Sequence, residues 1–277
     1  MIRLVVNADD LGLHPRIDAG ILRAHREGIV TSATVLVTGR SAQAAVHAAK
    51  EQGLALGVHL CLSTHLSPAA PPSQVRWLAP GGRFRAHWAE VAAAWAVGLI
   101  PPEEVARELR AQLARARELG FSPDHLDAHQ HLHLLPGLSG IVQRLAQEES
   151  LPLRWPLERP RPSWLLRPAA LAKSALLSTL AVASGRNPTR KVRGWGVFAS
   201  GVLDEARLLS VLRALPEGDH ELVCHPGLNA GVVPEDPRWS YRWESELAAL
   251  TSNVAQAAVR QRGIELTTYS ALHPSPG

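Results

Sequence analysis

The feature that most constrains the fold of this chain is a regular alternation of short apolar segments with helical segments. Several apolar segments carry β-branched residues and are bounded by polar clusters or glycine, which is typical of buried strands. We predict strands at residues 2–7, 32–38, 54–60, 124–129, 151–155, 194–198, 220–224 and 264–269. We predict helices at residues 17–28, 41–52, 101–119, 136–149, 169–183, 204–215 and 243–262. This order predicts a mainly parallel sheet with helices outside, in either a barrel or a doubly wound fold.

Length and composition fit a single large domain. The chain has 277 residues, of which 46% are apolar, so it can bury a sizeable core. An α/β barrel of this length is ordinary, and we expect residues 1–277 to form one domain. No GxGxxG sequence or P-loop follows the first strand, so nucleotide binding has little support. No basic patch with interleaved aromatic residues indicates nucleic-acid binding.

Positive charge is concentrated in one part of the chain. The net charge is +4, but residues 151–200 hold nine Arg or Lys and one acid, Glu158, so this segment carries +8 and the rest −4. Within it, residues 156–193 form an irregular insertion with five prolines and an apolar helical piece. We hypothesise that this basic and apolar insertion covers an amphiphilic substrate, such as a lipid-linked sugar, or makes a peripheral membrane contact. The alternatives are a solvated insertion, a lid or a homodimer contact.

The two cysteines, Cys61 and Cys224, lie far apart in the sequence and imply no disulfide framework, which favours a reducing compartment. The first residues are predicted to form a strand and lack the regions of a signal peptide. The most apolar runs, 91–100 and 174–183, are too short to span a bilayer. We expect a soluble cytoplasmic protein.

Four polar clusters follow the ends of predicted strands. They are Asn7-Ala8-Asp9-Asp10, Gly57-Val58-His59, the stretch from His125 to His133, and Val223-Cys224-His225-Pro226-Gly227. Active sites of parallel α/β folds gather at the carboxyl ends of strands. Four coincidences in one chain therefore indicate a functional site more strongly than any single cluster does.

The stretch from His125 to His133 packs four histidines and one carboxylate into nine residues. Imidazole is the commonest metal ligand, so the cluster predicts a metal or catalytic site. In an extended segment Asp127, His129, His131 and His133 share one face, although not all of them need reach one ion. The alternative is a solvated loop that is rich in histidine by chance.

Adjacent carboxylates repel each other unless a cation lies nearby, so Asp9-Asp10 at a strand end also favours a metal. Their side chains diverge, which leaves one as a ligand and the other as a base; the alternative is a turn or capping pair. His225 is a second candidate acid–base group, with a buried turn residue as its alternative. Cys61 alternates with His59, but a small buried core residue is the simpler interpretation.

These clusters resemble the YdjC-like carbohydrate deacetylase family nearly end to end. The resemblance rests on residues 7–13, 28–32, 57–60, 125–133 and 224–227. It implies a distorted (β/α) barrel, a divalent metal ion and removal of acetyl groups from N-acetylated sugars. Leu11 stands where a phenylalanine is usual, which changes packing and not chemistry. Residues 156–200 do not closely resemble the chitooligosaccharide-specific members, so the resemblance does not fix the sugar.

Carried over from the family, the resemblance implies roles for six residues. The metal ligands would be Asp10, His59 and His129. Asp9 would be the general base and His225 the general acid. Arg154 would orient Asp9 and lower its pKa, with an ordinary surface arginine as the alternative. Mixed histidine and carboxylate ligation suits zinc, nickel or cobalt, and magnesium or manganese remain candidates.

Two rival functions use the same residues differently. One is a metallohydrolase of a phosphoester, another ester or a non-sugar amide on a similar barrel. The other is a non-catalytic relative that binds a sugar or a lipid. Release of acetate from N-acetylated sugars, together with the metal content, distinguishes these alternatives.

Overall fold

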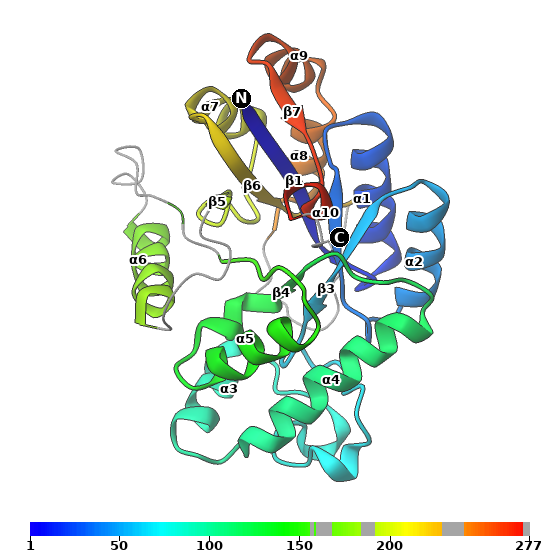
Figure 1. The fold of residues 1–277 in the computed structure, drawn as a ribbon, viewed down its shortest axis with the longest axis vertical. Helices are drawn as coiled ribbons and strands as arrows, with labels where there is room; N and C mark the ends of the chain where they lie inside the picture. The colour runs from blue at the N-terminus through cyan, green and yellow to red at the C-terminus, as the bar shows by residue number, and fades with distance from the viewer. Residues whose placement is uncertain (156–157, 159–167, 184–191, 229–240, 274–277) are drawn as a thin grey trace.

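The computed structural model describes residues 1–155, 158, 168–183, 192–228 and 241–273. Within this part, seven parallel strands form one sheet that curls into a half-barrel (Figure 1). The strands are β1 (Ile2–Leu11), β2 (Ser32–Val35), β3 (Ala55–Leu60), β4 (Leu126–Ala128), β5 (Val192–Trp195), β6 (Gly218–Cys224) and β7 (Ile264–Leu266). Their order is β4-β3-β2-β1-β6-β5, and β7 pairs with the start of β1. The long central strand β1 therefore carries the sheet.

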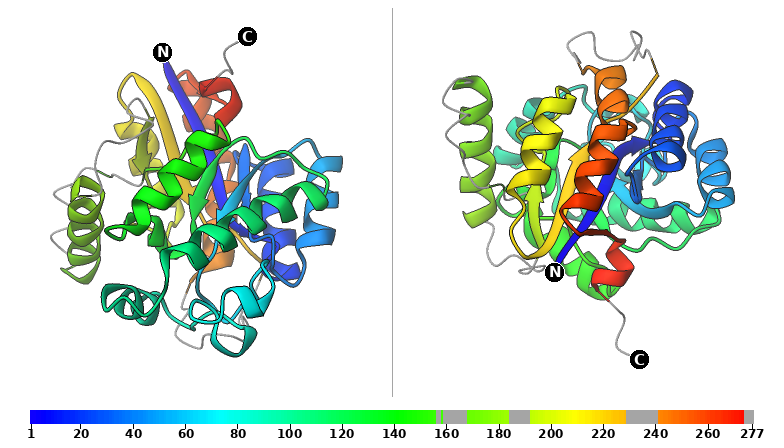
Figure 2. Two further views of the ribbon diagram at one scale, coloured as in Figure 1. Left: turned by 60° about the horizontal axis from the view of Figure 1, so that its bottom comes forward. Right: turned by 90° about the horizontal axis from the view of Figure 1, so that it is seen from above.

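Helices surround the curled sheet on its outer side (Figure 2). They are α1 (Pro15–Glu27), α2 (Ala42–Glu51), α3 (Trp88–Ala96), α4 (Pro102–Glu118), α5 (Leu138–Glu148), α6 (Pro168–Ala183), α7 (Glu205–Ala214), α8 (Trp243–Leu250), α9 (Asn253–Gln261) and α10 (Tyr269–Leu272). Helix α6 stands to one side of the others in all views. Of the helices in the described ranges, none has both the length and the apolar character needed to cross a bilayer.

The predicted distorted barrel is confirmed, but among the described residues no strand pairing joins β4 to β5, so this part of the barrel stays open. The predicted strand at 151–155 is wrong: only Leu153 forms an isolated bridge, to Leu126 of β4. The Leu126 amide donates to the Pro152 carbonyl, and the Arg154 amide donates to the Leu126 carbonyl, each at 2.8 Å. Because Pro152 has no N–H to offer, a longer ladder cannot form through this residue. Half of the insertion at 156–193 lies outside the described residues, and its predicted helical piece is confirmed as α6.

Two further predictions failed at helix boundaries. The single helix predicted at 243–262 is two helices, because the Ser252 hydroxyl accepts from the Ala255 amide at 3.0 Å and starts α9 anew. The predicted last strand ends early, and Thr268 caps the short helix α10. Helix α3 was not predicted; the His87 ring caps it, and histidine is not among the usual capping residues.

The long connection between β3 and α3 is held by one polar face of α4. Glu108 accepts from the amides of Ala69 and Ala70, and Glu104 accepts from those of Trp77 and Leu78, all at 2.9 Å. Both carboxylates are buried and lie four residues apart, which places them on the same face of the helix. These bonds fix a segment that has no regular pairing of its own.

The turn that ends β1 depends on a buried acid. Asp18 of α1 accepts from the Gly12 amide at 2.6 Å, and Gly12 has the left-handed φ of +90° that glycine tolerates. Burial raises the pKa of Asp18 from 3.8 to about 6. The folded state therefore holds the Asp18 proton more tightly than the unfolded state does. This stabilisation is complete at low pH and is lost as the pH rises through about 6.

We predict a pH-dependent difference in stability between the wild-type protein and Asp18→Asn, which keeps the acceptor but cannot ionise. From pH 4 to pH 7.5 the free energy of unfolding of the wild type should fall relative to the variant by about 2 kcal/mol. Urea unfolding of both proteins across this range measures the difference. A difference that stays constant with pH would contradict the raised pKa.

Candidate metal centre and active site

The carboxyl ends of β1, β3, β4 and β6 meet at one pocket, as the parallel register requires. Asp9 and Asp10 come from β1, His59 from β3, His129 directly follows β4, and His225 directly follows β6. All five line a pocket of about 430 Å³. The fold thus brings together four clusters that are widely separated in the sequence.

A backbone irregularity at the end of β1 admits both acids to this pocket. Successive side chains of a regular strand point to opposite faces of the sheet. At Asp10 the chain takes a left-handed conformation, with φ of 71°, and the pairing with β2 shifts register between Ala8 and Leu11. Such a conformation is unfavourable for a non-glycine residue and is often found at functional sites. It places the Asp9 and Asp10 carboxylates on the same side.

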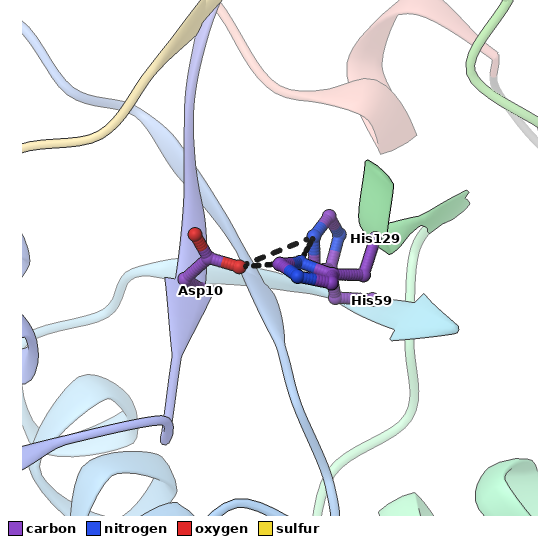
Figure 3. Close-up of side chains that lie close together, drawn as sticks. All are labelled: Asp10, His59 and His129. Atoms are coloured by element: carbon purple, nitrogen blue, oxygen red, sulfur yellow. Dashed lines mark hydrogen bonds and ion pairs between the residues drawn. The ribbon is translucent and has the colours of Figure 1, made fainter. Parts of the chain in front are cut away.

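Asp10, His59 and His129 form a buried cluster (Figure 3). The Asp10 Oδ1 atom lies 2.9 Å from Nδ1 of His129 and 3.4 Å from Nε2 of His59, and the two ring nitrogens are 3.2 Å apart. One oxygen and two nitrogens thus lie within 4.8 Å of one another. Two imidazoles and a carboxylate are a common ligand set for a divalent metal with positions left open.

Asp127 orients one of these imidazoles. Its Oδ1 atom lies 2.6 Å from Nδ1 of His59, which leaves Nε2 of His59 facing Asp10 and His129. Metal-bound histidines typically hold a carboxylate on the other ring nitrogen in this way. Burial alone would lower the pKa of His59, but Asp127, Asp10 and Asp9 outweigh it and raise this pKa well above 6.5. The cluster therefore favours positive charge at its centre, which suits a cation.

The histidines after His129 do not continue the predicted extended face. The chain turns at once into a 3₁₀ segment, His129–Leu134, in which Gln130 and His131 are left-handed. His131 lines the pocket, but the His133 ring lies against Trp155, and burial lowers the pKa of His133 to about 4. The expectation that all four side chains share one face is therefore wrong beyond His129.

Cys61 is a buried residue beside the pocket floor. Its Sγ atom lies 3.2 Å from the Ser63 carbonyl oxygen, and burial raises the pKa of its thiol. In the described part of the chain, Cys61 belongs to neither group of side chains that could hold a metal ion. These observations favour the interpretation of Cys61 as a small core residue.

Arg154 is buried with 1% exposure, so it is not the surface arginine considered as an alternative. Its Nη1 and Nη2 atoms bind Asp9 in a bidentate pair, each at 2.7 Å, and Nη1 also contacts Asp127. Its Nε atom donates to Glu221 at 2.5 Å. Burial would raise the pKa of Asp9, but the Arg154 guanidinium, together with His59 and His225, outweighs burial and holds this pKa well below its usual range. Asp9 is therefore ionised at neutral pH.

His225 lines the pocket close to Asp9. Its Nε2 atom lies 3.9 Å from Oδ2 of Asp9, and its ring meets that of Tyr241 edge-on at 4.7 Å. The His225 amide donates to Glu246 of α8 at 2.6 Å. Glu246 is fully buried, and burial raises its pKa to about 8. The backbone of His225 is thus anchored from outside the pocket.

Sequence reasoning did not assign functions to three buried acids at this site: Asp127, Glu221 and Glu246. Asp127 lies two residues before His129, and this spacing could have indicated a second carboxylate near the metal ligands. Glu221 was visible as a charged residue within a predicted buried strand. Glu246 lay inside a predicted helix, and no local pattern indicated that it meets His225.

Polar side chains of Thr64, His87, Gln130, His131 and Ser200 also line the pocket, and the other part of its wall is apolar and aromatic. It is formed by Trp88, Ala128, Leu132, Leu135, Leu176, Leu177, Leu180 and Tyr241. Leucines 176, 177 and 180 come from α6, the helix within the insertion. The pocket therefore places an acid, base and imidazole cluster opposite a hydrophobic surface.

A parallel half-barrel with buried carboxylates and imidazoles gathered at the carboxyl ends of its strands is the arrangement of a hydrolytic enzyme. The sequence model of the YdjC-like protein family matches residues 3–261. The chain belongs to this family.

Named relatives span the same length as this chain. A carbohydrate deacetylase of Brevibacillus brevis is 33% identical and covers 98% of this chain and 100% of its own. A carbohydrate deacetylase of Mus musculus is 34% identical, and the match covers 98% of this chain and 95% of the relative. A chitooligosaccharide deacetylase of Serratia marcescens is 31% identical, and the match covers 97% of this chain and 98% of the relative. A crystal structure from Enterococcus faecalis V583, described as a candidate cellobiose-phosphate cleavage protein, is 27% identical and superposes with a TM-score of 0.75 over 98% of both chains.

We predict that Asp127→Asn weakens divalent-metal binding. The amide cannot hold Nδ1 of His59 as the carboxylate does, so affinity should fall by about 10- to 100-fold. Titration of the purified protein against a competing chelator measures this change. Asp219→Asn is the control, because Asp219 pairs with Arg3 at the opposite end of β6. Equal affinities for Asp127→Asn and the wild type would contradict the orienting role.

Proposed function

We propose that this protein is a metal-dependent carbohydrate N-deacetylase, which hydrolyses the acetamide of an N-acetylated sugar to a free amine and acetate. One observation carries the proposal: an Asp10, His59 and His129 cluster lies beside an Asp9 carboxylate that Arg154 keeps ionised. The carbohydrate deacetylase relatives support the choice of substrate class.

Asp10, His59 and His129 are the residues that would hold the metal. Their donor set suits zinc, nickel or cobalt, and magnesium or manganese remain compatible with the carboxylate. When bound there, a divalent cation acidifies water and polarises the acetamide carbonyl. Asp127 and Asp9 add negative charge next to the site, which favours any cation bound there.

Asp9 acts as the general base in this proposal. It removes the proton from the attacking water as the new C–O bond forms at the acetamide carbon. The bidentate contact with Arg154 fixes both carboxylate oxygens, so the base approaches the water in one orientation. Because its pKa is held low, Asp9 is in the basic form at neutral pH.

His225 acts as the general acid. As the C–N bond breaks, its ring nitrogen donates a proton to the nitrogen that leaves as the amine of the sugar. The ring contact with Tyr241 and the backbone anchor on Glu246 set its position. Asp9 and His225 lie close together, so the base and the acid can both reach the same acetamide group.

We predict that Asp9→Asn retains bound metal but loses turnover, since the amide keeps the shape of the side chain and cannot accept the proton. Its kcat for acetate release from N-acetylglucosamine oligomers should fall by about 10²- to 10⁴-fold. Acetate release and metal content are measured together, with the wild type before and after chelator treatment as a reference. Persistent activity in Asp9→Asn would remove it from the role of base. Phosphate release from phosphoesters without acetate release would favour the rival hydrolase.

The natural sugar, we further propose, carries an apolar group, which lies along the leucines of α6. Leu176, Leu177 and Leu180 line the pocket, although Leu176 is 48% exposed in the protein alone. Contact with an apolar aglycone would remove this surface from water. Val182 of the same helix is 72% exposed and extends the apolar surface beyond the pocket, which supports a peripheral contact with a membrane that contains such a substrate.

We predict that Leu180→Ser raises KM for an N-acetylglucosamine alkyl glycoside several-fold more than for a chitooligosaccharide, because only the alkyl chain needs the apolar wall. Steady-state kinetics on both substrates give the ratio. Val254→Ser is the matched control, since Val254 is an exposed residue of α9 that does not line the pocket. Equal effects of Leu180→Ser on both substrates would contradict the aglycone proposal.

A cytoplasmic location remains part of the proposal. Cys61 and Cys224 are both buried and neither forms a disulfide. Unpaired cysteines are ordinary in a reducing compartment.

A further inference from the structure

A column of buried polar side chains lies beneath the candidate site. The interiors of (β/α) barrels are usually filled with layers of branched apolar residues. Here Arg154, Glu221, Tyr269 and His125 are buried, each with 3% exposure or less. None of Glu221, Tyr269 and His125 lines the pocket, so none of them reaches the substrate in the proposed mechanism.

These side chains are successive neighbours in space, from Arg154 to His125. The Nε atom of Arg154 donates to Oε1 of Glu221 at 2.5 Å. Burial and the neighbouring Glu221 carboxylate raise the pKa of the Tyr269 hydroxyl well above 10, so the hydroxyl stays protonated beside that carboxylate. The Tyr269 ring stacks on the ring of His125 at 3.8 Å and 11°, and Nδ1 of His125 lies 2.6 Å from Asp124.

The absence of a side chain at Gly57 leaves room for the His125 ring of this column. A Cβ atom on Gly57 would lie 2.4 Å from Cε1 of His125, closer than such atoms approach. Gly57 and His125 both belong to clusters that the sequence marks as functional, yet neither lines the pocket. Their shared contact explains why both accompany the residues that do.

The geometry of a guanidinium makes this support relevant to the base. The group is planar and offers its N–H donors along two edges. Arg154 presents one edge, Nη1 and Nη2, to Asp9 and the other, Nε, to Glu221. With Glu221 in place, the plane of the guanidinium is fixed at both edges. Without it, the guanidinium can turn and carry the Asp9 carboxylate with it.

We infer that Glu221 is a positioning residue that holds Arg154 and thereby sets the orientation of Asp9. This inference rests on the proposed function, because it gives Asp9 the role of base. It predicts an effect on turnover without an effect on substrate binding. A displacement of about 1 Å at a reacting group is enough to lower a rate by about 10²-fold.

The test compares Glu221→Gln, which keeps an acceptor for Nε, with Glu221→Leu, which has a similar size and no acceptor. We expect kcat to fall from wild type to Glu221→Gln to Glu221→Leu, reaching at least about ten-fold in the last. KM and metal content should stay within about two-fold of wild type. Glu104→Gln is the control for loss of a buried carboxylate, and its kcat should stay within about two-fold.

The inference is overturned if both Glu221 variants keep the wild-type kcat, or if their losses follow loss of metal or of folded protein. A wild-type protein that releases no acetate would refute the proposed function instead.

Discussion

The structure depends on one buried cation, the guanidinium of Arg154. It joins Asp9 of β1, Asp127 of β4 and Glu221 of β6, so it connects strands from across the curled sheet through its interior. Three carboxylates at close range repel each other strongly in a medium of low dielectric constant. Removing the arginine would leave these acids buried and uncompensated. The pocket therefore keeps its geometry through a charge that need not touch the substrate.

A polar interior of this kind is a demanding way to build a fold. Buried ion pairs often contribute less to stability than apolar residues of similar size would. The surrounding core supplies the stability instead, with apolar residues of β1, β2 and β3 packed against α1 and α2. Stability and chemistry are thus separated in space: the outer layer of the half-barrel is apolar, and its interior at the strand ends is polar.

Much of this fold could be predicted from local patterns, because strands and helices differ in the spacing of their apolar residues. The alternation placed β1, α1, β3, α4 and β6 within a few residues and predicted that four strand-end clusters would meet. Failures occurred where the deciding interaction was a single hydrogen bond, as at the Ser252 cap and the Pro152 bridge. The partners of Arg154 were harder still to predict from the sequence. Asp9 lies 145 positions away and Glu221 lies 67 positions away, and no local pattern encodes such pairs.

Because the described part of the barrel is open between β4 and β5, two walls of the pocket are held in place in different ways. Asp10, His59 and His129 are attached to a continuous ladder from β1 through β2 and β3 to β4. The leucine wall belongs to α6, which lies outside this ladder at the open margin. Strand pairing thus spaces the reactive groups, whereas side-chain packing holds the leucine wall, in part against the segment His129–Leu134. Substitutions in α6 can therefore reshape the apolar wall while the strand pairing that spaces the reactive groups stays the same.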